Sequence, residues 1–217
     1  MMFSIINGKI NSLLEKALVT HIGGVPVQQV LPYEELKSFS QEEIATVCHH
    51  YGFYQVVTQE LVDFIKPFVD GKNAIEIGAG NGALGRALGI KITDSCMQRR
   101  PDIMAHYAAL KQPLIKYPPD IIELDANDAV EKYTPDVVIG TWVTQKCYLP
   151  TEEGNYWGFK EDLFKGKVKK YIFIGNRATH GRKKILKLFP HKTYQFDWLV
   201  TRSMQKDKNV IYVFDCE

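Results

Sequence analysis

One short stretch of the sequence limits the fold more than any other. It places Gly78, Gly80 and Gly82 directly after the apolar run 74–77, and a second apolar stretch follows them. A short apolar run is typical of a buried strand, and alternating glycines permit a tight turn from a strand into a helix. Glycine also lets a ligand approach the backbone, and the free N–H groups of the helix start can face that ligand. The stretch therefore predicts an α/β fold with a ligand at this turn.

The second half of the chain alternates between expected strands and helices. Short strands separated by helices are typical of a parallel sheet that is covered on both faces. The last two strand-like segments have no helix between them, so we expect them to pair antiparallel as a hairpin. The expected strands are 74–77, 90–93, 121–124, 137–139, 171–174, 193–200 and 210–214, and the expected helices are 82–88, 101–110 and 129–133.

Residues 1–70 have a different pattern and are predicted to form an N-terminal helical extension or lid on a core domain, 71–217. Ser40 precedes Gln-Glu-Glu, which fits a capping box and predicts a helix start. A second helix is expected near 55–68, ending at Pro67 and Gly71. The ring-rich segment 49–54 between these helices is either a packed corner or a lid over the site. Its histidines, His49 and His50, reach the site only if the segment folds over it.

Composition sets outer limits on the function. The net charge of +2 gives no global attraction to nucleic acid. The four cysteines are far apart in the sequence, which argues against a zinc site or a disulfide framework and indicates a reducing compartment. No apolar stretch approaches the roughly 20 residues that span a membrane. We therefore expect a soluble, cytoplasmic protein with no metal site and no membrane partner.

The glycine turn alone does not choose the ligand, because Gly78, Gly80 and Ala83 also satisfy a dinucleotide-binding fingerprint. Carboxylates at the strand ends are more informative. Asp94 suits either cofactor, since both carry an adenosine ribose. Glu76 and Asp125 discriminate, because a carboxylate beside the turn repels a pyrophosphate and attracts the ammonium and sulfonium of S-adenosylmethionine.

The pattern Glu76-x-Gly78-x-Gly80-x-Gly82 resembles the first motif of the class I S-adenosylmethionine-dependent methyltransferases. The resemblance covers about residues 71–217, and in that family a C-terminal hairpin completes a seven-stranded sheet. It implies that Glu76 steadies the methionine amino group of the cofactor. It also implies that Gly78 and Gly80 allow the close backbone approach.

Two further acids fall where the second and third cofactor motifs of that family fall. The resemblance implies that Asp94 binds the ribose hydroxyls, and that Asp125 with Ala126 binds the adenine. The fold that it implies is a doubly wound, mostly parallel α/β sheet of seven strands. The cofactor that it implies is S-adenosylmethionine.

In the same family the residues after the fourth strand face the transferred methyl group, and here these are 140–146. The segment lacks the Asp/Asn-Pro-Pro-aromatic box of amino methyltransferases and the Pro-Cys nucleophile used on cytosine. Thr141 and Gln145 are candidates for polar contacts to the substrate, and Trp142 is either a pocket wall or a core residue. A small-molecule substrate is expected, while RNA and protein substrates remain open.

His180 follows the fifth strand and is the candidate catalytic base, since its unperturbed pKa is near 6.5. A surface or capping role is the alternative. Two basic clusters are either solvated faces or phosphate contacts: Lys165, Lys167, Lys169 and Lys170, and Arg182, Lys183, Lys184 and Lys187. The sequence thus favours a methyltransferase. A catalytically silent cofactor-binding module and an NAD(P)-dependent oxidoreductase are the alternatives.

Overall fold

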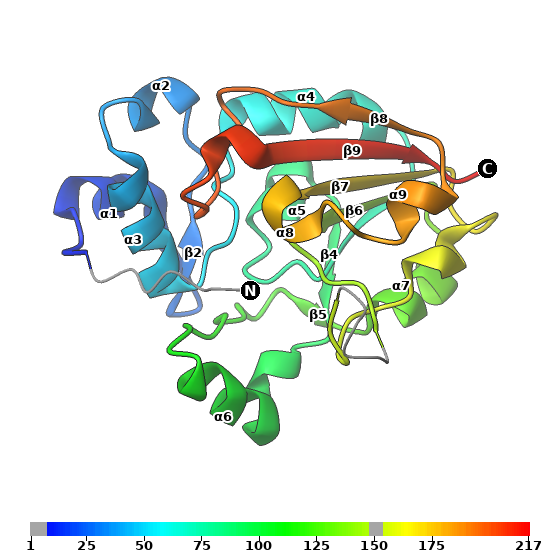
Figure 1. Ribbon diagram of the computed structural model, residues 1–217, viewed down its shortest axis with the longest axis horizontal. Helices are drawn as coiled ribbons and strands as arrows, with labels where there is room; N and C mark the ends of the chain where they lie inside the picture. Colours follow the sequence, from blue (N-terminus) through cyan, green and yellow to red (C-terminus); the bar gives the residue numbers. More distant parts are fainter. Residues whose placement is uncertain (1–7, 148–153) are drawn as a thin grey trace.

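The computed structural model describes residues 8–147 and 154–217. Its centre is a seven-stranded sheet in the order β5-β4-β3-β6-β7-β9-β8 (Figure 1). The strands from β5 to β7 in this order are parallel, and β9 is antiparallel to both of its neighbours. The predicted doubly wound sheet with a C-terminal hairpin is confirmed. The strands are β3 (Ala74–Ile77), β4 (Lys91–Asp94), β5 (Ile122–Glu123), β6 (Val137–Thr141), β7 (Lys170–Asn176), β8 (His191–Tyr194) and β9 (Asn209–Asp215).

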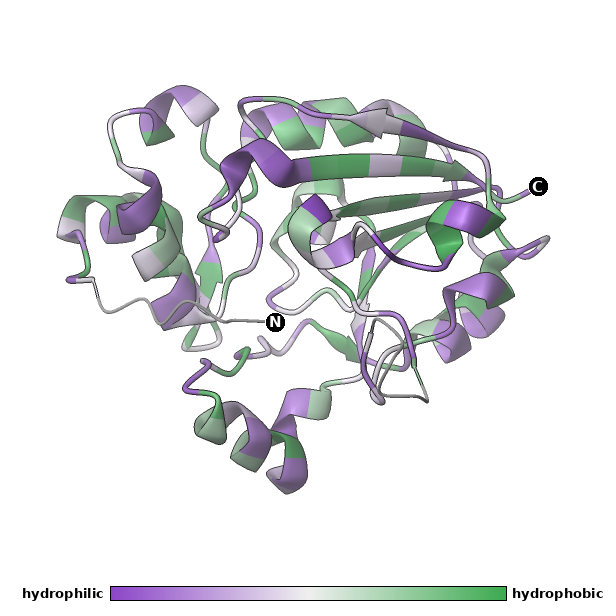
Figure 2. Ribbon diagram, viewed as in Figure 1, coloured by the Kyte–Doolittle hydropathy of each residue, from purple (hydrophilic) through white to green (hydrophobic). Residues whose placement is uncertain are grey.

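Alternate residues of the central strands enter two separate cores. On one face, Ile139 and Ile174 pack with α4 (Gln59–Val69) and α5 (Ala83–Leu88). On the other face, Val138, Tyr171 and Phe173 pack with residues of α7 (Ala126–Tyr133), η2 (Glu161–Phe164) and α9 (Ile185–Leu188). Figure 2 shows the central strands as largely hydrophobic, as expected for a sheet buried on both faces.

A strand and a helix of the core differ from their predicted bounds for identifiable reasons. The strand expected at 193–200 ends at Tyr194, because Phe196 and Trp198 instead stack on each other, with ring centroids 4.3 Å apart, and pack against Phe64 of α4. The helix expected at 129–133 begins earlier, at Ala126, because the Asp125 side chain accepts a hydrogen bond from the Asn127 N–H and caps it.

The N-terminal residues form a further core of their own around α1 (Ser12–Leu18), α2 (Tyr33–Leu36) and α3 (Gln41–Tyr51). The predicted capping box at Ser40 is confirmed, because its hydroxyl accepts from the Glu43 N–H and the Glu43 carboxylate accepts from the Ser40 N–H. The prediction of a helical extension was incomplete, since a hairpin of β1 (Val19–Ile22) and β2 (Val25–Gln28) is also present.

The second predicted N-terminal helix was placed too early and ended too early. Thr58 caps α4, so the helix begins at Gln59, and the chain before it is extended. Pro67 lies within the helix, which continues to Val69. Pro67 has no N–H, so one backbone hydrogen bond of the helix is absent there.

Helix α6 (Pro101–Ala109) lies outside the two layers. It was predicted at 101–110, and it follows η1 (Met97–Arg99). Ile103 is its one buried residue, and Figure 1 shows the helix projecting from the sheet. Over residues 8–147 and 154–217, no helix combines the length and the apolar character needed to cross a membrane.

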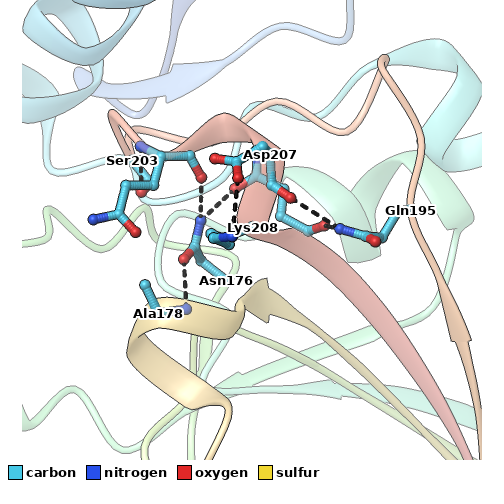
Figure 3. A network of polar contacts seen from close by, with 8 residues as sticks. Asn176, Ala178, Gln195, Ser203, Asp207 and Lys208 are labelled. Carbon is cyan, nitrogen blue, oxygen red and sulfur yellow. Dashed lines mark hydrogen bonds and ion pairs between the residues drawn. The ribbon is translucent and has the colours of Figure 1, made fainter.

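A polar network closes the corner at the carboxyl end of β7 (Figure 3). The Asn176 side chain donates to the Gln205 carbonyl and to Asn209 Oδ1, and it accepts from the Ala178 N–H at 2.9 Å, which caps α8 (Arg177–His180). Asn209 in turn donates to the Leu199 carbonyl. The network fixes the segment before β9, which includes η3 (Lys206–Lys208) and contacts the N-terminal residues.

Candidate cofactor-binding site

The glycine turn has the predicted strand-turn-helix form. Gly78, Gly80 and Gly82 have φ angles of +55°, +59° and +71°, which place all three in the left-handed region. A Cβ on Gly78 would lie 2.5 Å from a methyl carbon of Val143, so this position excludes a larger side chain on steric grounds as well. The turn therefore requires glycine both for its conformation and for its packing on the loop after β6.

Glu76 lies beneath this turn and is 2% exposed. Its Oε2 accepts a hydrogen bond of 2.8 Å from the Gly85 N–H at the start of α5. Burial raises the pKa of this carboxyl to about 8, against the opposing effects of the Gly85 N–H and the Arg86 charge. A buried carboxylate is stabilised by a cation beside it, so the site favours a positively charged ligand group.

Asp94 closes β4 as predicted, and it also holds the turn in shape. Its Oδ2 accepts from the Gly80 N–H at 2.9 Å and its Oδ1 accepts from the Cys96 N–H at 2.8 Å. Burial raises the pKa of Asp94 above its ordinary value, while these two N–H groups oppose that shift. Each carboxylate oxygen has more than one acceptor position, so both can still accept from ligand hydroxyls.

Two cavities lie along the turn and share part of their walls. The first is lined by Glu76 and the residues of the glycine turn, with Gln28, Tyr54 and Gln55 from the N-terminal part. The second is lined by Asp94, Asp125 and Ala126 together with several aromatic rings: Tyr54, Tyr107, Tyr117, Trp142, Trp157 and Phe159. Four residues line both cavities: Tyr54, Gly78, Ile115 and Thr141. The cavities therefore meet above Gly78.

The side chains in these walls that can carry a full charge near neutral pH are all acidic. Among the described residues that line the two cavities they are Glu76, Asp94 and Asp125, with no lysine or arginine. Arg86 lies near the turn, but its guanidinium forms two hydrogen bonds to the Asp120 carboxylate, at 2.9 and 3.0 Å. The walls are thus suited to a neutral or cationic ligand and unsuited to a pyrophosphate.

The predicted substrate residues divide into two groups. Thr141 lines both cavities, and Trp142 lines the second with a left-handed backbone, φ +57°. Gln145 lines neither; it is buried, and its Oε1 accepts from the Lys184 N–H at 2.7 Å. Asp125, although it caps α7, is exposed and borders the second cavity beside Ala126.

His180, the predicted base, also lines neither cavity. Its ring packs edge-on against Trp142 and Phe173, with centroids 5.1 and 5.0 Å away, and Nδ1 accepts from the Asn176 N–H. Burial, with a contribution from the Lys183 charge, lowers the pKa of His180 to about 3. A buried, neutral imidazole behind Trp142 has the surroundings of a core residue that supports the cavity wall.

The two basic clusters do not form one phosphate-binding face. Lys183 is 3% exposed and pairs with the equally buried Glu161 at 2.9 Å, so it belongs to the interior. Lys170 begins β7, and Lys167 and Lys169 form ion pairs with Glu131 and Asp136. Lys167, Lys169 and Lys170 lie at the amino end of β7, whereas the cavities lie at the carboxyl ends of the parallel strands.

The N-terminal segment contributes residues that sequence reasoning did not assign to the site. Gly52 and Tyr54, within the predicted corner or lid, line the first cavity, whereas His49 and His50 do not. Gln55 also lines it and is 3% exposed. No local pattern marks Gln55, and long-range contacts to the segment before β9 bring it and Tyr54 to the turn.

Comparisons with known proteins reach only the level of the fold. No family model matches the sequence, and no curated protein is similar to it. Among solved structures, protein 1320 of Thermoplasma acidophilum is 12% identical with a TM-score of 0.35, over 85% of this chain and 94% of that one. PH1948 of Pyrococcus horikoshii, a candidate RNA methyltransferase, is 16% identical with a TM-score of 0.36, over 81% and 82%.

A third similar structure is the tRNA (uracil-54, C5)-methyltransferase of Pyrococcus abyssi in complex with S-adenosylhomocysteine. It is 12% identical with a TM-score of 0.40, over 92% of this chain and 44% of that one. At these identities and TM-scores, no function is transferred to this chain from the similar structures. The chemistry of the site therefore rests on the chain's own residues.

Proposed function

We propose that this chain is an S-adenosylmethionine-dependent methyltransferase with a small-molecule substrate. The observation that carries the proposal is the set of charges in the cavity walls: three carboxylates, one of them buried under the glycine turn, and no basic residue among the described lining. S-adenosylmethionine presents an ammonium and a sulfonium to these walls. A nicotinamide dinucleotide would present a pyrophosphate to the same carboxylates.

The two cavities fit the two ends of that cofactor. Glu76 would hold the methionine ammonium in the first cavity, where Gly78 and Gly80 permit close backbone approach and Gly82 begins α5. In the second cavity, Asp94 would accept from the ribose hydroxyls. Asp125 and Ala126, at the start of α7, would border the adenine.

The sulfonium would then lie where the cavities meet, near Tyr54 and Thr141. The bound cofactor supplies an electrophilic methyl group, and the protein supplies alignment of the acceptor with it. Tyr54 and Trp142, with ring centroids 5.9 Å apart, would wall the acceptor. Orientation of two reactants accounts for a large part of the barrier reduction in such reactions.

The surroundings of the cavities favour a small acceptor over RNA. RNA binding draws most of its affinity from lysine and arginine contacts to phosphates. The cluster at 165–170 lies at the opposite end of the sheet, where two of its lysines form ion pairs, and in the cluster at 182–187 Lys183 is buried.

We also propose that residues 1–70 serve as a lid on the core domain 71–217, since Gly52, Tyr54 and Gln55 form one wall of the first cavity.

The proposal is tested by supplying methyl-labelled S-adenosylmethionine together with a cell extract divided into low-mass, RNA and protein fractions. We expect protein-dependent label in the low-mass fraction. Label confined to RNA or protein would overturn the small-molecule assignment. Cofactor binding without transfer to any fraction would instead support a silent binding module.

A further inference from the structure

Two residues that line the first cavity each have an amide oxygen with no partner within the described chain. Gln55 Oε1 and Asn81 Oδ1 are both buried, and neither accepts a hydrogen bond. Both residues line the cavity that Glu76 also lines. Buried acceptors without a donor are uncommon because each costs free energy to desolvate, so a donor from a ligand is expected at these atoms.

The orientation of the Gln55 amide is determined by its neighbours. Its Nε2 donates to two backbone carbonyls, those of Val56 and Val200. A flipped amide would place Oε1 against both carbonyl oxygens, which is unfavourable. The unpartnered atom of Gln55 is therefore an oxygen, and the side chain cannot exchange it for a donor.

The adjacent Gln28 shows what a purely structural glutamine looks like in the same cavity wall. Its Nε2 donates to the Gln55 carbonyl at 2.6 Å, and its Oε1 accepts from the Val57 N–H at 3.1 Å. Both ends of the Gln28 amide are thus used by the backbone. Gln55 differs from it only in having one free acceptor.

We infer that Gln55 and Asn81 bind the ammonium of the cofactor's methionine end, next to Glu76. This inference rests on the proposed function. An ammonium carries three N–H donors and no acceptor, which matches two amide oxygens and a carboxylate. The cofactor site is then composite, because Gln55 comes from the N-terminal segment while Glu76 and Asn81 come from the sheet and its turn.

Binding would consequently tie the N-terminal segment to the sheet. Gln55 and its neighbour Val56 already bond to Val200, through the Gln55 amide and through the Val56 N–H at 3.0 Å. The Thr201 carbonyl and the Ser203 carbonyl accept from Gln41 of α3, both at 2.8 Å. The ammonium would add a link from Gln55 to the glycine turn on the other side.

The experiment compares two ligands by calorimetry at pH 8. S-adenosylhomocysteine carries the ammonium, and 5′-methylthioadenosine lacks the whole amino-acid end. We expect Gln55→Met to weaken S-adenosylhomocysteine binding about ten-fold, as for loss of a charge-assisted hydrogen bond, and to leave 5′-methylthioadenosine binding within about two-fold. Asn81→Ala should show the same selective loss, while Gln28→Met should change the affinities for both ligands to the same extent.

Equal effects of Gln55→Met on both ligands, or no effect on either, would overturn the inference while the proposed function stands. Should Gln55→Met fail to fold, the Asn81→Ala variant decides by the same ratio of affinities. If the wild-type protein binds neither ligand, the proposed function itself fails and the inference fails with it. A final check uses the S-adenosylhomocysteine analogue without its amino group, whose affinity should not respond to Gln55→Met.

Discussion

A single carboxylate, Glu76, connects the local sequence pattern to the proposed chemistry. Because burial raises its pKa to about 8, the ligand-free carboxyl is largely protonated at pH 7. A cationic ligand requires the ionised form, so binding releases a proton. We predict that S-adenosylhomocysteine affinity falls about ten-fold for each pH unit below 8. Calorimetry between pH 6 and pH 8 measures this, and a flat profile in the wild-type protein would contradict it.

The same raised pKa predicts how pH affects the stability of the ligand-free protein. The folded state keeps a proton that the unfolded state, with the ordinary pKa of 4.5, releases. The folded protein therefore loses stability as the pH rises from about 4.5 to 8. Glu76→Gln removes the ionisation, so we predict a Tm higher than wild type by a few degrees at pH 8 and little changed at pH 4. A Tm of Glu76→Gln below that of the wild type at pH 8 would contradict this prediction, because it would show that the ionised Glu76 carboxylate does not destabilise the folded protein.

Gly78 offers a test that separates conformation from packing. Gly78 and Gly71 both have positive φ angles, +55° and +69°, but a Cβ on Gly71 would meet nothing within 4 Å. Gly71→Ala should cost about 1–2 kcal/mol from left-handed strain alone. Gly78→Ala should cost more, because its Cβ also meets Val143, and it should abolish S-adenosylhomocysteine binding. Urea unfolding gives the free energy of unfolding of both variants. Equal losses would show that the Val143 side chain moves aside without a cost in stability.

The loop after β6 is held in place by the buried Lys183 side chain, which is itself held by residues of η2 and β7. Lys183 Nζ donates to the Val143 carbonyl at 3.0 Å and lies over the Phe173 ring. Its partner Glu161 accepts from the Tyr171 hydroxyl at 3.0 Å. This hydrogen bond fixes the backbone at Val143, whose side chain lies against Gly78 of the glycine turn. The neighbouring Trp142 lines the second cavity.

We predict that Lys183→Met destabilises the protein by about 3–5 kcal/mol, because it leaves the Glu161 carboxylate buried without its cation. Replacing both partners, by Lys183→Met with Glu161→Leu, should recover much of this loss. Lys187→Met is the matched control in the same segment, since that side chain is exposed and should change stability by about 0.5 kcal/mol or less. Urea unfolding decides, and equal effects at the two lysines would refute the structural role of Lys183.

The elements that could be predicted from the sequence are those whose signals are local. The strand-turn-helix at Gly78 and the acid ending β4 follow from neighbouring residues, as does the capping box at Ser40. Lys183 could not be distinguished from the exposed lysines around it, because its burial depends on Glu161, which lies 22 positions earlier. The surroundings of His180 could not be predicted either, since its pKa is lowered by burial and by the nearby Lys183 charge, which depend on the packing of the whole fold.

The molecule as a whole joins two units at the carboxyl ends of the parallel strands (Figure 1). One is the sheet, whose parallel pairing and C-terminal hairpin followed from the strand and helix alternation, whereas its strand order did not. The other is the N-terminal unit, whose hairpin of β1 and β2 and whose contribution of Gln55 to the cavity had no sequence signal, although Tyr54 lies in the ring-rich segment 49–54. Its attachment depends on pairings such as Gln41 with Thr201, which are 160 residues apart. Long-range contacts of this kind cannot be derived from periodicity.

The proposed cofactor site at the glycine turn should bind a cationic cofactor and not a dinucleotide. Calorimetry of the wild-type protein at pH 8 with S-adenosylhomocysteine and, separately, with NAD⁺ tests it most directly. We expect one S-adenosylhomocysteine bound per chain and no measurable heat from NAD⁺. Binding of NAD⁺ with no response to S-adenosylhomocysteine would contradict it.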